Sequence, residues 1–152
     1  MSKTRKFEIT NSKQSQKCKC SKHKTKPGKF EMNNDPKQYD LEERTFRFAK
    51  DIRAFVKRLP RNICNLEDGK QLVRASGSIG ANYIEANEAL SKKDFQLRIK
   101  ICRKEAKESR YWLRLVDTDE DKSLEADRMN LIAESTELMK IFAAIMHKSQ
   151  KG

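Results

Sequence analysis

Four segments of the chain repeat apolar and small residues at alternating steps of three and four positions, with one charged interruption at Arg128, and this repeat constrains the fold most strongly. Such spacing places side chains on one face of an α-helix, and seams with this period pack between near-parallel helices at about 20°. We therefore predict four helices around one core. The stripes are Leu41, Thr45, Phe48, Ile52, Phe55 and Leu59; Leu72, Ser76, Ile79, Tyr83, Ala86 and Leu90; Phe95, Ile99, Cys102, Ala106, Ser109, Leu113 and Val116; and Leu124, Arg128, Leu131, Ser135, Leu138, Phe142 and Ile145.

Local signals place the ends of these helices. Pro60 stops the first, Asn65 is the expected N-cap of the second, and Ser91 with Asp94 resembles a capping box for the third. The acidic turn 117–121 precedes the fourth. Because short connections make sequence neighbours antiparallel, we predict an all-α protein that forms an antiparallel up-down-up-down four-helix bundle.

The positive charge is concentrated at the N-terminus. The 152 residues carry a net charge of +12, and residues 1–37 hold 11 Lys and Arg against 3 Asp and Glu, a net +8. A polar segment with so few apolar residues cannot offset the entropy of ordering it. We predict a disordered basic arm over residues 1–37, the bundle over 38–148 and a tail over 149–152.

The same composition bounds the cellular setting. The longest uncharged run, residues 75–84, is too short to span a membrane, and no apolar stretch follows the basic start of the chain. The four cysteines suggest no disulfide framework. We expect a cytoplasmic protein without a signal peptide.

A basic stripe on the third helix is the clearest candidate binding site. Like charges one turn apart destabilise a helix slightly, so the stripe gains from an external anion or from acids on the fourth helix, where Asp127, Glu134 and Glu137 are available. A solvated face is the ordinary alternative. The charge of the arm favours phosphate as the partner, bound through backbone electrostatics with weak sequence specificity. Only Trp112 and the three tyrosines are suited to stack on bases. The predicted contacts are Lys100, Arg103, Lys107, Arg110 and Arg114, with Lys17, Lys19, Lys22 and Lys24 of the arm.

A second apolar row lies beside the core stripes. This row of apolar and small residues, on the second, third and fourth helices, is either part of a wide buried face or a subunit interface, and the sequence favours neither. Ile132, Met139 and Met146 continue it on the fourth helix. Small residues on the second helix would let another helix approach closely. As an oligomer interface the row comprises Val73, Gly77, Gly80, Ile84 and Trp112.

The sequence contains little that indicates a catalytic site or a metal site. Cys18, Cys20 and His23 could supply three zinc ligands, but no fourth is evident, and free thiols are the simpler interpretation. The segment 77–80 lacks the spacing of a phosphate-binding loop, and helix packing explains its glycines better. The row Asn82, Glu85 and Glu88 is expected to be a solvated face with hydrogen bonds between helices. We predict no enzyme activity, no cofactor and no metal.

Residues 72–86, 93–95, 99–109 and 112–113 resemble the four-helix-bundle proteins encoded in intervening sequences of bacterial 23S rRNA genes. The shared pattern is R-A-x-x-S-I-x-x-N-x-x-E, from Arg74 to Glu85, followed by Asp94-Phe95. Many members have Glu-Gly where this chain has Glu85-Ala86, which points to a divergent branch. The resemblance extends from the 40s to 147 and excludes the arm.

The resemblance implies an up-down bundle that assembles as a ring, a homopentamer, without established enzymatic activity. A related branch, the accessory proteins of diversity-generating retroelements, implies binding to nucleic acid and to a reverse transcriptase. We predict a basic oligomeric bundle that binds the backbone of RNA or DNA within a ribonucleoprotein or reverse-transcriptase complex. The alternative is a protein-interaction scaffold without direct nucleic-acid binding.

Overall fold

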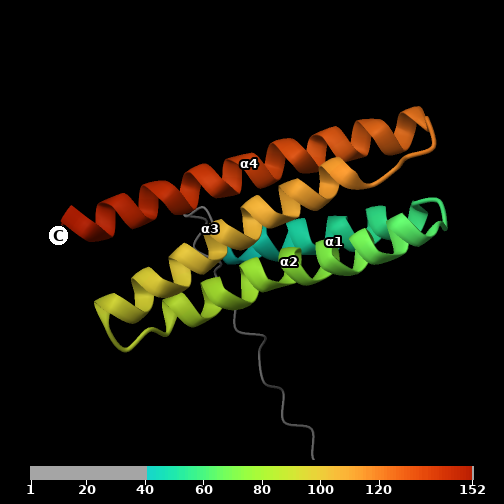
Figure 1. Ribbon diagram of the computed structural model, residues 1–152. Helices are drawn as coiled ribbons and strands as arrows, with labels where there is room; N and C mark the ends of the chain where they lie inside the picture. The colour runs from blue at the N-terminus through green and yellow to red at the C-terminus, as the bar shows by residue number, and fades with distance from the viewer. Residues whose placement is uncertain (1–40, 152) are drawn as a thin grey trace, which may run out of the picture. The chain divides into compact units, whose positions relative to one another are not determined.

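The computed structural model describes residues 41–151, and within that range all regular structure is helical (Figure 1). The all-α prediction is confirmed. The predicted disorder of residues 1–37 lies outside the described residues. The helices are α1 (Leu41–Arg58), α2 (Ile63–Asn87), α3 (Lys92–Leu115) and α4 (Lys122–Lys151).

Each helix packs against two others. The helix backbones lie close together between α1 and α2, α2 and α3, α3 and α4, and α4 and α1. Across the core, the Tyr83 ring of α2 meets the Phe142 ring of α4 with centroids 6.0 Å apart. Consecutive helices run in opposite directions, as the colour course of Figure 1 shows. This cyclic order is the predicted up-down-up-down bundle, and it leaves one long face of each helix free for solvent or a partner.

The predicted stripes form the core. All six residues of the first stripe, the five in α1 and Leu59 just after it, are buried, and Phe142, Leu138, Leu113 and Ile79 are completely inaccessible to solvent. The small hydroxyl residues of the stripes are also buried, and each donates to a carbonyl oxygen of its own helix, as Ser109 Oγ does to Glu105 O at 2.9 Å. Because these hydroxyls are satisfied internally, they fill the core without the cost of an unpaired polar group.

Small residues on α2 let α1 approach closely. A Cβ atom added to Gly69 would lie 3.0 Å from Val56 Cγ1, and one added to Gly80 would lie 3.4 Å from Thr45 Oγ1. Segment 77–80 lies within the continuous helix α2, so its glycines serve helix packing, as the sequence analysis favoured.

Two predicted details at helix ends are wrong. The N-cap of α2 is Asn62, whose Oδ1 accepts from the backbone N–H of Asn65 at 2.8 Å. Leu90 is fully exposed, because α2 ends at Asn87 and the loop turns the side chain away from the core. At its end, α4 includes residues 149–151 of the predicted tail, and Gln96 Nε2 donates to Ser149 O at 3.1 Å.

Asn65 ties together two loops at one end of the bundle. Its Nδ2 donates to Pro60 O and to Asp117 O, each at 2.9 Å, and its Oδ1 accepts from the backbone N–H of Asp117 at 2.8 Å. The side chain is buried. It therefore fixes the α1–α2 connection against the α3–α4 connection, 52 residues away in sequence.

Replacing this residue tests the link. Asn65→Ala should lower the free energy of unfolding by about 2 kcal/mol, because buried partners lose their hydrogen bonds. Urea denaturation at fixed protein concentration measures the change. Asn87→Ala, at the exposed end of α2, is the control and should change stability by less than about 0.5 kcal/mol. Equal effects of the two substitutions would contradict this role for Asn65.

Candidate nucleic-acid interface

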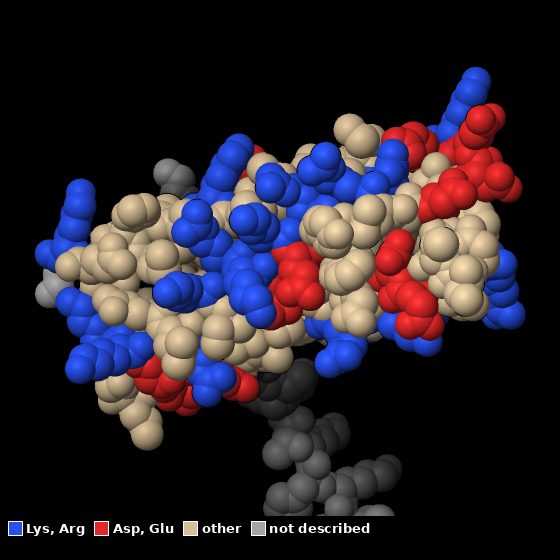
Figure 2. Space-filling model, viewed as in Figure 1, with Lys and Arg blue, Asp and Glu red and all other residues tan. Residues whose placement is uncertain are grey.

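The five cations of the predicted stripe lie along one face of α3. Lys100, Arg103, Lys107 and Arg114 are exposed, and Arg110 is half-buried. Figure 2 shows Lys and Arg side chains gathered over the middle of the face that α3 presents. The steps of three and four positions carry the stripe over 15 residues, about 21 Å of helix from the first to the last. The structure thus keeps the predicted cations together on the surface.

The acids of α4 do not neutralise this stripe. Glu134 accepts two hydrogen bonds from Arg44 of α1, the shorter being 2.6 Å from Nε, and Asp127 pairs with Arg58 Nη1 at 2.5 Å. The third acid, Glu137, pairs with Lys140 Nζ at 2.7 Å on its own helix. These carboxylates therefore support the α1–α4 contact and the surface of α4.

The acids of α3 are also occupied by groups outside the stripe. Glu105 pairs with Lys104 Nζ at 3.6 Å, and Glu108 accepts a hydrogen bond from Trp112 Nε1 at 3.4 Å. Within residues 41–151, none of the stripe's five cations has a carboxylate partner within 4.0 Å. Adjacent like charges raise the local positive potential, and an external anion would relieve their repulsion.

The remaining predicted contacts fall into two groups. Lys17, Lys19, Lys22 and Lys24 lie outside the described residues, as do Cys18, Cys20 and His23 of the alternative zinc cluster. Trp112 is half-buried and packs against the core, whereas its neighbour Tyr111 is exposed over 55% of its surface. Of the two adjacent aromatic residues on α3, only Tyr111 presents much of its ring to solvent.

The second apolar row is divided between the core and the surface. Val73 and Trp112 pack against the core, as do Ile132, Met139 and Met146 of α4. Gly77 and Gly80 face α1 of the same chain, while Ile84 is 47% exposed. Most of the row thus belongs to a wide buried face, and Ile84 remains available to a partner.

A groove between α1 and α2 contains that exposed part of the row. Its volume is about 840 Å³, and Phe46, Ala81 and Ile84 contribute apolar surface to it. Phe46 is 61% exposed. The groove was not evident from the sequence, because Phe46 lies outside the core repeat of its helix and only the packing register of α1 on α2 brings it beside Ile84.

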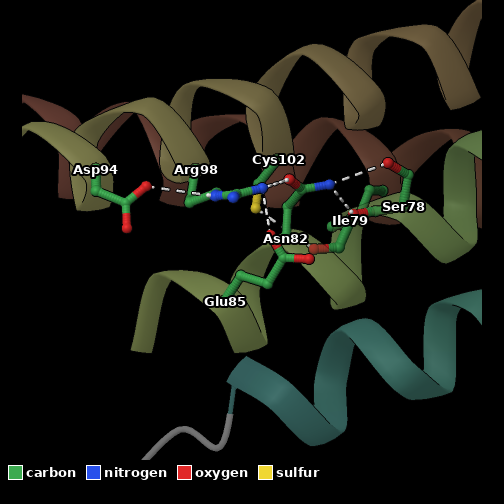
Figure 3. A network of polar contacts seen from close by, with 7 residues as sticks. All are labelled: Ser78, Ile79, Asn82, Glu85, Asp94, Arg98 and Cys102. Carbon is green, nitrogen blue, oxygen red and sulfur yellow. Dashed lines mark hydrogen bonds and ion pairs between the residues drawn. The ribbon is translucent and has the colours of Figure 1, made fainter. Parts of the chain in front are cut away.

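Two members of the polar row, Asn82 and Glu85, face α3, as Figure 3 shows, whereas Glu88 is exposed just beyond the end of α2. Arg98 forms ion pairs with Glu85 and, through Nε at 3.5 Å, with Asp94, and its Nη1 lies 3.5 Å from Asn82 Oδ1. Asn82 Nδ2 in turn donates to Ser78 O at 2.9 Å. These interactions connect α2 and α3 and leave Asn82 and Glu85 in a structural role, as the sequence analysis favoured.

Cys102 lies beneath this network. Its Sγ donates to Ile79 O at 3.4 Å across the α2–α3 contact. Burial disfavours the thiolate and raises the pKa of Cys102 to about 12, so the side chain is a neutral thiol at physiological pH. Cys64, by contrast, is exposed. No described helix combines the length and the apolar composition of a membrane-spanning segment.

The fold and the unpaired stripe define a class, a four-helix bundle with a cationic face on its third helix. Residues 37–144 match the family model of the 23S rRNA-intervening sequence protein. The chain belongs to this family, and the resemblance drawn from the motifs of α2 and α3 is confirmed.

Among solved structures, the chain is similar to a protein of unknown function from the S23 ribosomal protein family of Bacteroides thetaiotaomicron VPI-5482, whose crystal structure was determined at 1.70 Å. The two share 32% sequence identity with a TM-score of 0.60, and the similarity covers 70% of this chain and 97% of the other. The search of curated proteins found no match.

Proposed function

We propose that this protein is a non-enzymatic, cytoplasmic bundle that binds the phosphate backbone of a nucleic acid through α3 and the basic arm, residues 1–37. The observation that supports the proposal is the unpaired row Lys100, Arg103, Lys107, Arg110 and Arg114. Cations that neutralise phosphates release condensed counterions, so affinity falls as salt rises, and the sequence of the nucleic acid contributes little. A ribonucleoprotein or reverse-transcriptase complex is a setting that such binding would suit.

Deleting residues 1–37 tests the contribution of the arm. We expect a shallower dependence of the logarithm of the binding constant on the logarithm of salt concentration. If Lys17, Lys19, Lys22 and Lys24 each contact one phosphate, the slope loses about 3 units. Fluorescence anisotropy with a labelled 20-nucleotide RNA, or with DNA of the same sequence, provides the measurement. Equally poor binding by full-length and shortened protein at low salt would exclude nucleic-acid binding.

The α1–α2 groove supports a second proposal, self-association. Exposed Phe46 and Ile84 on either side of a groove of about 840 Å³ offer apolar surface that another copy could bury. A scaffold that binds a protein partner without contacting nucleic acid would use the same surface.

A charge in the groove tests this second proposal. Ile84→Glu should weaken assembly and leave a helical monomer, because a carboxylate at the contact must lose its hydration. Light scattering gives the mass, for which the family resemblance implies five subunits, and circular dichroism confirms the helices. Glu88→Gln, at an exposed site beyond the groove, is the control. A mass unchanged by Ile84→Glu would count against this interface.

A further inference from the structure

An exposed aromatic ring lies directly beside the basic stripe. Tyr111 is 55% exposed, and on the helix it is one turn from Lys107, at i−4, and one turn from Arg114, at i+3. Residues at these separations are surface neighbours. The ring therefore lies between two cations that have no ion-pair partner within the described residues.

The ring of Tyr111 packs against the ring of Trp112. It meets the Trp112 ring edge-on, with centroids 5.0 Å apart and an interplanar angle of 76°. Trp112 is anchored in turn, because it packs against the core and its Nε1 donates to Glu108 Oε1 at 3.4 Å. A ring held in this way loses less conformational freedom when a ligand covers it.

An exposed ring between cations suits one kind of nucleic acid better than another. Proteins that bind single strands combine a positive track for the backbone with aromatic rings on which bases stack. The bases of a duplex are already stacked on one another, so they cannot cover a ring that lies beside the backbone contacts. A single strand can place a phosphate at Lys107, a base on Tyr111 and a further phosphate at Arg114.

We propose that the partner of α3 is a single-stranded nucleic acid whose phosphates follow the stripe and one of whose bases stacks on Tyr111. This inference rests on the proposed nucleic-acid binding. It adds that the nucleic acid is single-stranded and that Tyr111 contacts one of its bases. Stacking tolerates every base, so the contact adds affinity for exposed bases without selecting a sequence.

The test compares three probes in which every strand carries a 5′-phosphate, so that the numbers of phosphates are equal: a 12-nucleotide oligouridylate, an abasic strand of the same length and a 6-base-pair duplex made only of G·C pairs. We expect the full-length protein to bind the oligouridylate most tightly. Tyr111→Ser should weaken binding of the oligouridylate about 30-fold, the middle of the range for loss of one stacked base, and leave the abasic strand unaffected. Tyr111→Phe should retain binding, since it keeps the ring.

Leu97→Ser is the matched control, because Leu97 is an apolar residue of the same helix that is also 55% exposed and lies far from Tyr111 along the helix. It should change none of the three affinities. Tighter binding of the duplex, or equal binding of the oligouridylate by the Tyr111→Ser variant and the unmodified protein, would overturn the single-strand proposal while the backbone interface stands. If the unmodified protein binds none of the three probes at low salt, the proposed function itself is overturned.

Discussion

Neutralising the centre of the stripe should abolish most of the affinity for nucleic acid. In the variant Arg103→Gln, Lys107→Gln, Arg110→Gln, we expect the binding constant to fall about 50- to 150-fold near 0.15 M salt. Each lost phosphate contact removes about 0.7 to 0.9 units of the salt slope, which corresponds to roughly a factor of four to five at that concentration. Anisotropy with the same labelled strand measures the loss.

A variant with the same change in net charge provides the control. Lys50, Lys57 and Lys122 are exposed cations on α1 and at the start of α4, outside the stripe. Replacing all three with Gln removes three charges without touching the stripe. We expect only a small loss of affinity from this control. If the two triple variants bind equally weakly, overall charge governs binding and the stripe has no special role.

The core should respond as strongly in a different measurement. Leu113→Ala should lower the free energy of unfolding by about 3 kcal/mol, because Leu113 is completely buried and its truncation leaves a cavity between helices. Typical domains have a stability of about 5–15 kcal/mol, so this loss is a large share. Urea denaturation at fixed protein concentration measures it.

Leu115 offers a control for this substitution on the same helix. It has the same side chain but is 48% exposed, so Leu115→Ala should cost less than about 1 kcal/mol. A similar cost for both leucines would contradict the orientation of α3, and with it the placement of the cationic stripe on the outer surface.

The sequence predicted the features of this fold that depend on local spacing. The three-four repeat identified the buried face of every helix, and Ser91 was correctly assigned as the N-cap of α3, where its Oγ accepts from the backbone N–H of Asp94 at 3.1 Å. Both signals act within a few residues of the chain. The stripe on α3 was predictable for the same reason, because helical periodicity alone aligns its members.

The wrong N-cap of α2 and the unforeseen contacts concern features that depend on distant residues. Asn62 and Asn65 are equally good N-caps by type, and only the bonds from Asn65 to Asp117 show why the second is buried instead. Likewise, the pairing of Glu134 with Arg44 depends on the register of α4 against α1, 90 residues away in sequence. The exposure of Tyr111 beside the stripe also became clear only from the packing.

The salt dependence of binding tests the central claim most directly, since it counts the phosphates that α3 neutralises. We predict that the slope of the logarithm of the binding constant against the logarithm of salt concentration becomes shallower by about 2 to 3 units when Arg103, Lys107 and Arg110 are replaced with Gln. The control triple on α1 and α4 should retain the slope of the unmodified protein. An identical slope for the unmodified protein and the stripe variant would contradict the account.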